Sequence, residues 1–170
     1  MQRKVISILV QNHAGVLARV SSLFGRRGFN IDSLTVSATN DPGISRITVV
    51  VHDDEKVLDQ IMKQTQRLEE TCNIFRLENE KSLLRELLLV RVAANAHNRG
   101  ELREIADIYK ARIIDMAPAS MAIELTGEPE KIDAFLTMLG HYNVLELCRT
   151  GITAMARGDG SKHIHTEKGV

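Results

Sequence analysis

The residues with the clearest chemical potential lie where an apolar strand gives way to a helix. Residues 5–11 alternate as in a strand, Asn12 and Gly15 occupy the turn that follows, and helical spacing begins near Ala14. A helix start leaves backbone N–H groups without partners and carries partial positive charge, so it suits a small carboxylate. Gly15 lets a ligand approach the backbone, and Asn30 could reach its polar groups from the next strand. A helix start capped by Asn12, with no ligand, is the alternative explanation.

No set of residues has the spacing of a catalytic site. Ser21 and Ser22 fall inside the expected helix, and the sequence contains neither a nucleophile elbow nor a cysteine–histidine pattern. Asp32 and Asp115 occupy corresponding strands of two similar halves, and a single carboxylate in each place is weak support for acid–base chemistry. We expect these aspartates to make polar contacts at strand edges, and we predict no catalytic residues.

Metal binding has equally little support. The segment His163-Ile164-His165 is the only tight histidine pair, and it lies in a polar stretch without an obvious third ligand. Helix capping explains His52-Asp53-Asp54 more simply than metal ligation does. Cys72 and Cys148 show no metal-type spacing, and we interpret each as a small buried hydrophobic residue. The sequence therefore predicts no metal site.

Charge and hydropathy narrow the classes of partner. The 170 residues include 22 basic and 22 acidic side chains, whereas nucleic-acid and anionic-membrane binders usually carry a basic excess. The strand expected at 44–51 has no aromatic residue on which RNA bases could stack. No apolar run approaches the roughly 20 residues of a membrane span, and the N-terminus leads directly into a strand, so no signal peptide is expected. We expect a cytoplasmic protein without nucleic-acid or membrane partners.

The elements that position the turn follow the order β-α-β-β-α-β, which is typical of a ferredoxin-like domain. Helical and alternating apolar patterns, with turn residues between them, predict strands at 5–11, 31–38, 44–52 and 72–77 and helices at about 14–27 and 53–68.

The order then repeats after a short charged link at 78–82. The second half has predicted strands at 87–94, 112–116, 121–126 and 144–149, with helices at 100–110 and from Pro129. The predicted fold class is α+β, with two ferredoxin-like domains in tandem. We place them at residues 1–78 and 83–157, followed by a polar flexible tail at 158–170; the helical and strand patterns already fade from Gly151 onward.

One face of the first predicted sheet is mixed in polarity rather than fully polar. Domains of about 75 residues are marginally stable alone, so we expect another sheet or a second chain to cover part of that face. The residues on it are Val5, Leu9, Thr35, Ser37, Arg46, Thr48 and Val50.

The sequence from the opening turn onward resembles an ACT domain, and more closely it is similar to the regulatory small subunit of acetohydroxyacid synthase, also called acetolactate synthase. The strings that carry the resemblance are QNHAGVLARV at 11–20 and LFGRRGFNIDSLTV at 23–36, supported by DPGISR at 41–46, DEKVLDQI at 54–61, IID at 113–115 and KIDAFL at 131–136. The likeness runs in order to about Gly158.

The resemblance implies a non-catalytic subunit that activates a separate catalytic large subunit. That partner condenses pyruvate with pyruvate or 2-ketobutyrate, and it would hold thiamine diphosphate, Mg²⁺ and FAD, so no cofactor is expected here. The resemblance also implies a homodimer formed through ACT domains, with feedback inhibition by a branched-chain amino acid, usually valine, bound at their interface. The second domain is expected to help pairing or to contact the catalytic subunit.

Carried over by position, the effector contacts from one chain are Asn12, His13, Ala14, Gly15, Val16 and Leu17, while Asn30 and Ile31 come from the neighbouring chain. Two other functions stay open from the sequence. One is an ACT-type amino-acid sensor that acts on a different partner, and the other is a stand-alone small-molecule enzyme on a duplicated ferredoxin-like scaffold.

Overall fold

The computed structural model describes residues 3–26, 28–52 and 54–158, and the chain divides into two compact units. One unit contains the residues up to Leu83 together with those from Ile152 onward, and the other is Leu84–Gly151. The second unit is therefore inserted between two segments of the first.

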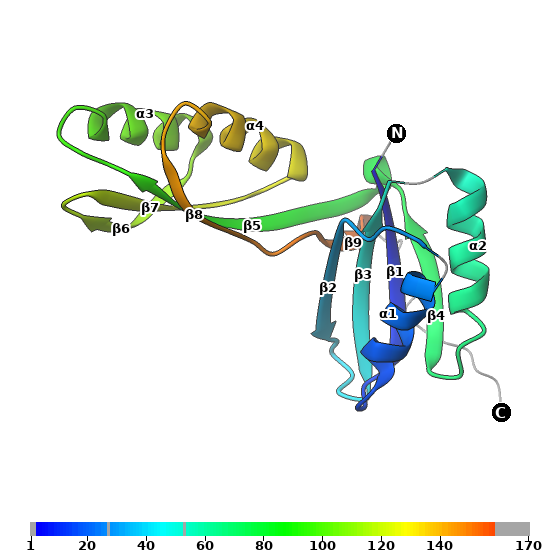
Figure 1. Ribbon diagram of the computed structural model, residues 1–170. Coiled ribbons are helices and arrows are strands. Elements are labelled where there is room, and N and C mark those ends of the chain that lie inside the picture. The colour runs from blue at the N-terminus through cyan, green and yellow to red at the C-terminus, as the bar shows by residue number, and fades with distance from the viewer. Residues whose placement is uncertain (1–2, 27, 53, 159–170) are drawn as a thin grey trace. The chain divides into compact units, whose positions relative to one another are not determined.

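The first unit has the predicted β-α-β-β-α-β order, built on an antiparallel sheet with strand order β2-β3-β1-β4 (Figure 1). Its elements are β1 (Lys4–Gln11), α1 (Val16–Arg26), β2 (Ser33–Ala38), β3 (Ile44–Val51), α2 (Glu55–Thr65), β4 (Thr71–Leu77), a 3₁₀ turn at Asn79–Lys81 and a late strand β9 (Thr153–Ala156). These bounds confirm the predicted order of elements and move the predicted ends by a few residues.

The helices cover one face of this sheet because alternate residues of β1 and β3 meet the apolar stripes of α1 and α2. Ile6, Ile8 and Val10 are buried there against Phe24 of α1 and Ile61 of α2. The side chain of Asp54 accepts a hydrogen bond from Val57 N at 2.9 Å, which fixes the start of α2 as the capping pattern predicted.

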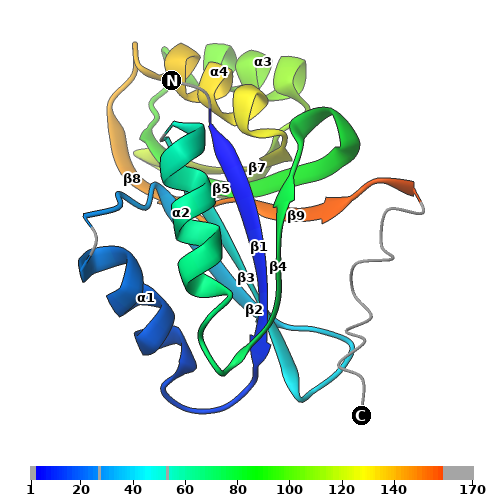
Figure 2. The ribbon, with the colours of Figure 1, turned by 90° about the vertical axis from the view of Figure 1, so that its right-hand side faces the viewer.

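The opposite face of the sheet is covered partly by the chain's own C-terminal segment. Val5, Ser7 and Leu9 are fully buried on that face, and Ile152 and Ala154 are buried as well. β9 contacts β4, which it crosses in Figure 2, and pairs with β5. The expectation that residues from Gly151 onward lack regular structure is wrong for β9, because a four-residue strand is too short to show an apolar period.

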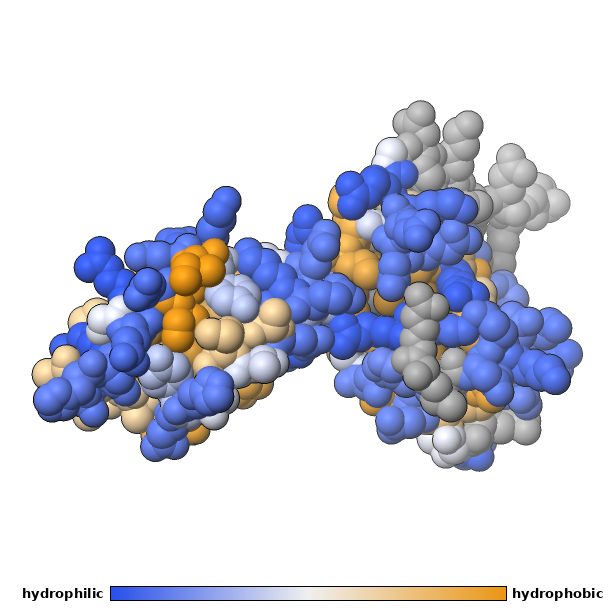
Figure 3. Space-filling model, turned by 90° about the horizontal axis from the view of Figure 1, so that it is seen from above, coloured by the Kyte–Doolittle hydropathy of each residue, from blue (hydrophilic) through white to orange (hydrophobic). Residues whose placement is uncertain are grey.

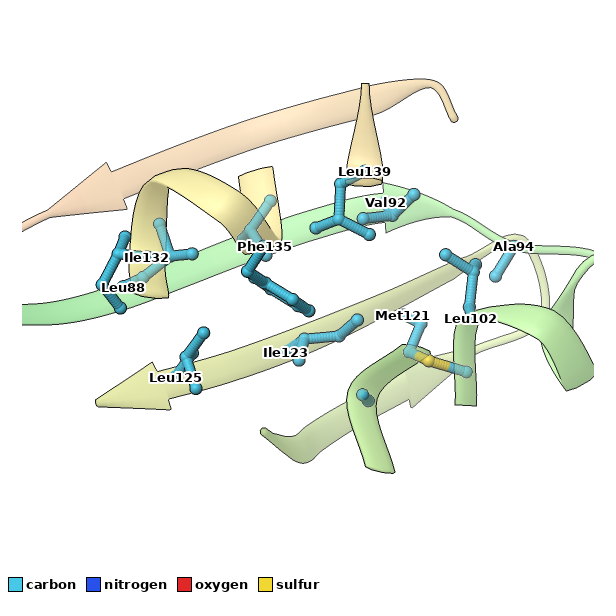
Figure 4. Packing of buried hydrophobic residues seen from close by; sticks show 12 residues of the cluster. Leu88, Val92, Ala94, Leu102, Met121, Ile123, Leu125, Ile132, Phe135 and Leu139 are labelled. Carbon is cyan, nitrogen blue, oxygen red and sulfur yellow. The ribbon is translucent and has the colours of Figure 1, made fainter. Parts of the chain in front are cut away.

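The second unit repeats the same architecture, with strand order β6-β7-β5-β8. Its elements are β5 (Ser82–Ala93), α3 (Arg99–Tyr109), β6 (Arg112–Ala117), β7 (Ser120–Gly127), α4 (Pro129–Leu139) and β8 (Val144–Arg149). Figure 4 shows Ile132 of α4 beside Leu88 of β5, Phe135 of α4 extending toward Ile123 of β7, and Leu102 of α3 close to Ala94, and these residues belong to its buried core. Both predicted ferredoxin-like units are therefore present.

The strand β5 begins five residues before its predicted start at Leu87. Arg85 and Glu86 interrupt the apolar pattern there, although Glu86 is buried. Its carboxylate pairs with Arg149 of β8, whose guanidinium also donates to Asp133 at 2.7 Å. Burial alone would lower the pKa of Arg149, but the hydrogen bonds to Glu86 and Asp133 raise it above the ordinary arginine value. A charged residue usually indicates an exposed position, so the buried and paired Glu86 made the start of β5 resemble a linker in the sequence.

Several apolar side chains remain on the surface of the second unit, where Figure 3 shows patches of apolar colour. Leu145 and Leu147 of β8 and Met116 of β6 are each about half exposed. Cys148 is exposed and Cys72 only partly buried, so the interpretation of both as buried hydrophobic residues is wrong. None of the helices in the described part of the chain has the length and apolar character that a membrane span requires.

Candidate functional site

The turn after β1 is tied to the hairpin loop between β2 and β3. Asn12 N donates to Gly43 O at 2.8 Å, and Asn12 Nδ2 donates to Pro42 O at 2.9 Å. The main-chain and side-chain amides of Asn12 therefore join two loops, whereas the alternative drawn from the sequence was that Asn12 caps α1. These two hydrogen bonds hold the turn against the hairpin loop just before α1 begins.

Gly15 gives this turn an open surface. Its φ is +89°, a left-handed conformation that side-chain-bearing residues adopt only with strain, and a Cβ placed on it would meet no atom within 4 Å. Arg19 N donates to Gly15 O at 3.1 Å, so the glycine carbonyl already belongs to the first helical turn. The backbone N–H groups of Ala14 and Leu17 have no partner among the described residues. These donors lie at the start of α1, where unpaired N–H groups give the helix its partial positive charge, and such an arrangement suits a carboxylate.

The other residues of the opening turn divide by burial. Val16 is buried in the core, while His13 is exposed, with Nδ1 3.2 Å from Ala14 O and Nε2 3.2 Å from Gln11 Oε1. Leu17, one of the expected effector contacts, is 43% exposed. Leu17 is thus available to an external apolar group.

Asn30 and Ile31 lie beyond the other end of the sheet. Ala38 pairs with Ser45 at the end of the ladder near the opening turn, and Ser33 pairs with Val50 at the opposite end. Five residues of strand separate these ends, which is about 17 Å. Asn30 is exposed and Ile31 half-buried. One chain therefore does not bring the two predicted groups of effector contacts together.

An ion pair and a histidine–carboxylate contact next to these segments were not predicted as parts of the site. Arg19 pairs with Glu70, a buried acid whose carbonyl accepts from Gln11 N at 2.9 Å. At the other end, His52 Nδ1 lies 2.5 Å from the carboxylate of Asp32. The contact of Asp32 agrees with the polar contact expected of it, but its partner His52 and the Arg19–Glu70 pair could not be predicted, because both pairings join residues far apart in sequence.

The candidates for other chemistry stay separate in the structure. Ser21 Oγ donates to Leu17 O at 2.7 Å, and Asp115 pairs with Arg91 at 3.2 Å, which agrees with polar contact at a strand edge. The described residues contain no group of three or more histidine, cysteine or acidic side chains that could hold a metal ion. His163 and His165 lie outside the described residues.

Comparison with known proteins assigns both units to one family. The family model for the acetolactate synthase small-subunit-like ACT domain matches residues 6–73, and the model for the small subunit of acetolactate synthase matches residues 85–158. The chain is 46% identical to a probable acetolactate synthase small subunit of Archaeoglobus fulgidus over 157 residues, covering 92% of this chain and 98% of the relative. It is 39% identical over 158 residues to the acetolactate synthase isozyme 3 small subunit of Salmonella typhimurium, covering 92% of this chain and 97% of that one.

A solved structure gives the same assignment. The crystal structure of the acetolactate synthase small subunit from Thermotoga maritima has a TM-score of 0.85 and 36% identity, covering 94% of this chain and 99% of that chain. The agreement extends over both units and nearly the full length of each relative. The chain therefore belongs to the family of acetolactate synthase small subunits.

Proposed function

We propose that this chain is the regulatory subunit of acetohydroxyacid synthase, that it activates a separate catalytic large subunit, and that it confers feedback inhibition by a branched-chain amino acid, namely valine. The observation that carries the proposal is the full-length family match together with the open helix start at Gly15. Thiamine diphosphate, Mg²⁺ and FAD belong to the catalytic subunit, and both subunits work in the cytoplasm.

The chemistry of a free amino acid fits the two groups of residues. Its carboxylate would accept from the backbone N–H groups of Ala14, Gly15 and Leu17 at the start of α1, where the helix dipole favours an anion. Its ammonium would donate to the side-chain oxygen of Asn30, since an amide oxygen is an acceptor. Its branched side chain would pack on the exposed part of Leu17 and on Ile31.

Two copies of the chain are needed to build such a site. A two-fold axis beside β2, the edge strand of the first sheet, sets the strand antiparallel to its copy. The Asn30 end of one copy then meets the Gly15 end of the other, which gives two equivalent sites for each dimer. Val36 of β2 is 42% exposed and Leu17 of α1 is 43% exposed, so an apolar surface is available for this contact.

Co-purification is the experiment that tests the function. The tagged chain is expected to retain a thiamine-dependent synthase from a lysate of its own organism, both with and without valine, and to bind valine in calorimetry. An ACT-type sensor of another process would retain a different partner. Conversion of pyruvate by the purified chain alone would show a stand-alone enzyme and would overturn the proposal.

A further inference from the structure

The C-terminal strap, residues 152–157, is held on the first sheet by two side chains from neighbouring strands. Thr35 Oγ1 of β2 donates to Ile152 O at 2.9 Å, and Arg46 Nη1 of β3 donates to Ala154 O at 3.1 Å. At the far end of the strap, Arg157 N donates to Lys81 O at 2.9 Å. The first two bonds end on main-chain carbonyls, so they fix the path of the strap independently of its side chains.

The surface beneath the strap is shielded from water, so a hydrogen bond lost there is not readily replaced by a bond to water. Ser7 and Thr48 are buried there, as are Ile152 and Ala154 of the strap itself. Burial lowers the pKa of the Arg46 guanidinium, although the group remains charged because arginine ionises far above neutral pH. Both donors are part-buried, so the loss of either carbonyl acceptor is unfavourable, and each bond contributes to holding the strap in place.

The strap joins the two parts of the chain that the proposed function has to connect. Thr35 lies on β2 four residues after Ile31, at the end of the segment that carries Asn30. Ile152 follows directly on Gly151, the last residue of the second unit, whose φ of +81° favours glycine. A displacement of β2 therefore reaches, through one hydrogen bond, the segment that leaves the second unit.

We infer that Thr35 and Arg46 are positioning residues that couple effector binding at the ACT interface to the second unit through the C-terminal strap. The inference rests on the proposed function and adds the path of its regulation. Binding at the interface shifts β2 relative to β3. The strap takes one bond from each of these strands at carbonyls only two residues apart, so the shift breaks or re-forms the Thr35 bond while the Arg46 bond holds. Coupling of this kind requires two discrete arrangements of the strap, one with the Thr35 bond and one without it, and the exchange measurement below tests for them.

The test separates effector binding from the response to binding. Thr35→Val keeps the shape of the side chain and removes the donor, Thr35→Ser keeps the donor, and Ser37→Ala changes an exposed residue on the same face of β2. For each full chain, valine affinity is measured by calorimetry, and inhibition by valine is measured after reconstitution with the catalytic subunit. Hydrogen exchange of the backbone amides of 153–157 is followed with and without valine.

We expect Thr35→Val to bind valine within about twofold of the unaltered chain while the inhibitory response weakens at least about fivefold, a typical size for a coupling effect. Exchange in the strap should respond to valine in the unaltered chain and in Thr35→Ser and Ser37→Ala, but not in Thr35→Val. If Thr35→Val binds valine and is inhibited as before, the strap is only structural and the inference is wrong. If the unaltered chain does not bind valine, the proposed function itself fails and the inference falls with it.

Discussion

Gly15 and Asn30 lie beyond opposite ends of the same sheet, although only fifteen positions separate them in the chain. The helix α1 runs from one end of the sheet to the other. Gly15 precedes the helix and Asn30 follows it, so the length of the helix separates them. Each residue can therefore supply only part of a small-molecule site. In the dimer proposed above, a second copy with antiparallel β2 strands would supply the missing part at both ends.

Gly15→Asp is predicted to abolish valine binding. The new carboxylate would stand where the effector carboxylate must lie, and two like charges about 4 Å apart repel by roughly 4 kcal/mol near a protein surface. We expect calorimetry to show at least about a hundredfold weaker affinity. Gly15→Ala is the matched control, since it shares the strain of φ +89° but adds no charge. An equal loss of valine affinity in both variants would show that backbone strain causes the effect and that repulsion between carboxylates does not.

Mixing two defective chains is predicted to restore one of the two effector sites in each mixed dimer. Asn30→Ala should weaken binding at both sites of its own dimer, as Gly15→Asp does. In a mixed dimer, one site would carry both substitutions and the other would carry neither. Refolded or co-expressed mixtures should therefore regain about one normal site for each mixed dimer. A mixture that binds no better than its two parents would place the whole site within a single chain.

Leu17→Asp is predicted to convert the chain from a dimer into a monomer. Leu17 is 43% exposed at the start of α1 and belongs to the proposed dimer contact, and burying an unpaired carboxylate in an apolar contact is strongly unfavourable. Light scattering at micromolar concentration should report twice the chain mass for the unaltered protein and the chain mass for the variant. Ile108→Asp, at a 70% exposed position on α3, should leave the dimer intact. Dissociation by Ile108→Asp alone would place the interface in the second unit.

The order of elements was predictable because each helix and most strands have one buried face, and apolar residues recur with that face's period. The pattern failed where charge is buried, as at Glu86, and where a strand is too short to have a period, as in β9. Long-range pairing decides both cases. The partner of Glu86 is Arg149, sixty-three residues away, and the strap docks on strands more than a hundred residues before it.

The candidate site was predictable in part for a similar reason. Gly15 is marked by residue type, because an open left-handed turn needs glycine, and the structure gives it that conformation. The role of Asn12 was not predictable from spacing, since its amide bonds the loop at Pro42 and Gly43, which the fold brings beside it. The assignment of Asn30 and Ile31 to a neighbouring chain came from family resemblance, and it remains a prediction that the mixing experiment tests.

The stability of the first unit is predicted to depend on pH through Glu55. Hydrogen bonds from Lys4 and Arg76 lower the pKa of Glu55 below its ordinary value of 4.5. A lowered pKa means that the stabilising contribution is present above pH 4.5 and is lost as the pH falls through the folded-state value. Glu55→Gln should therefore reduce the denaturation midpoint at about pH 7 and make little difference at about pH 3.

Glu130→Gln is the matched control for this effect. It also changes an acid in the first turn of a helix, α4, but one without an ion pair among the described residues. A pH profile in which Glu55→Gln and Glu130→Gln behave alike would show that the contacts with Lys4 and Arg76 contribute nothing in solution.

Reconstitution of acetohydroxyacid synthase activity tests whether this chain is a regulatory subunit. The purified catalytic large subunit is titrated with this chain, acetolactate formation from pyruvate is measured, and valine is then added to the saturated complex. We expect the chain to raise the activity and valine to lower it again. The Gly15→Asp chain should still activate the catalytic subunit but should no longer respond to valine. Activity that is unchanged by a full equivalent of the chain, or that valine lowers equally with the unaltered chain and with Gly15→Asp, would contradict the account.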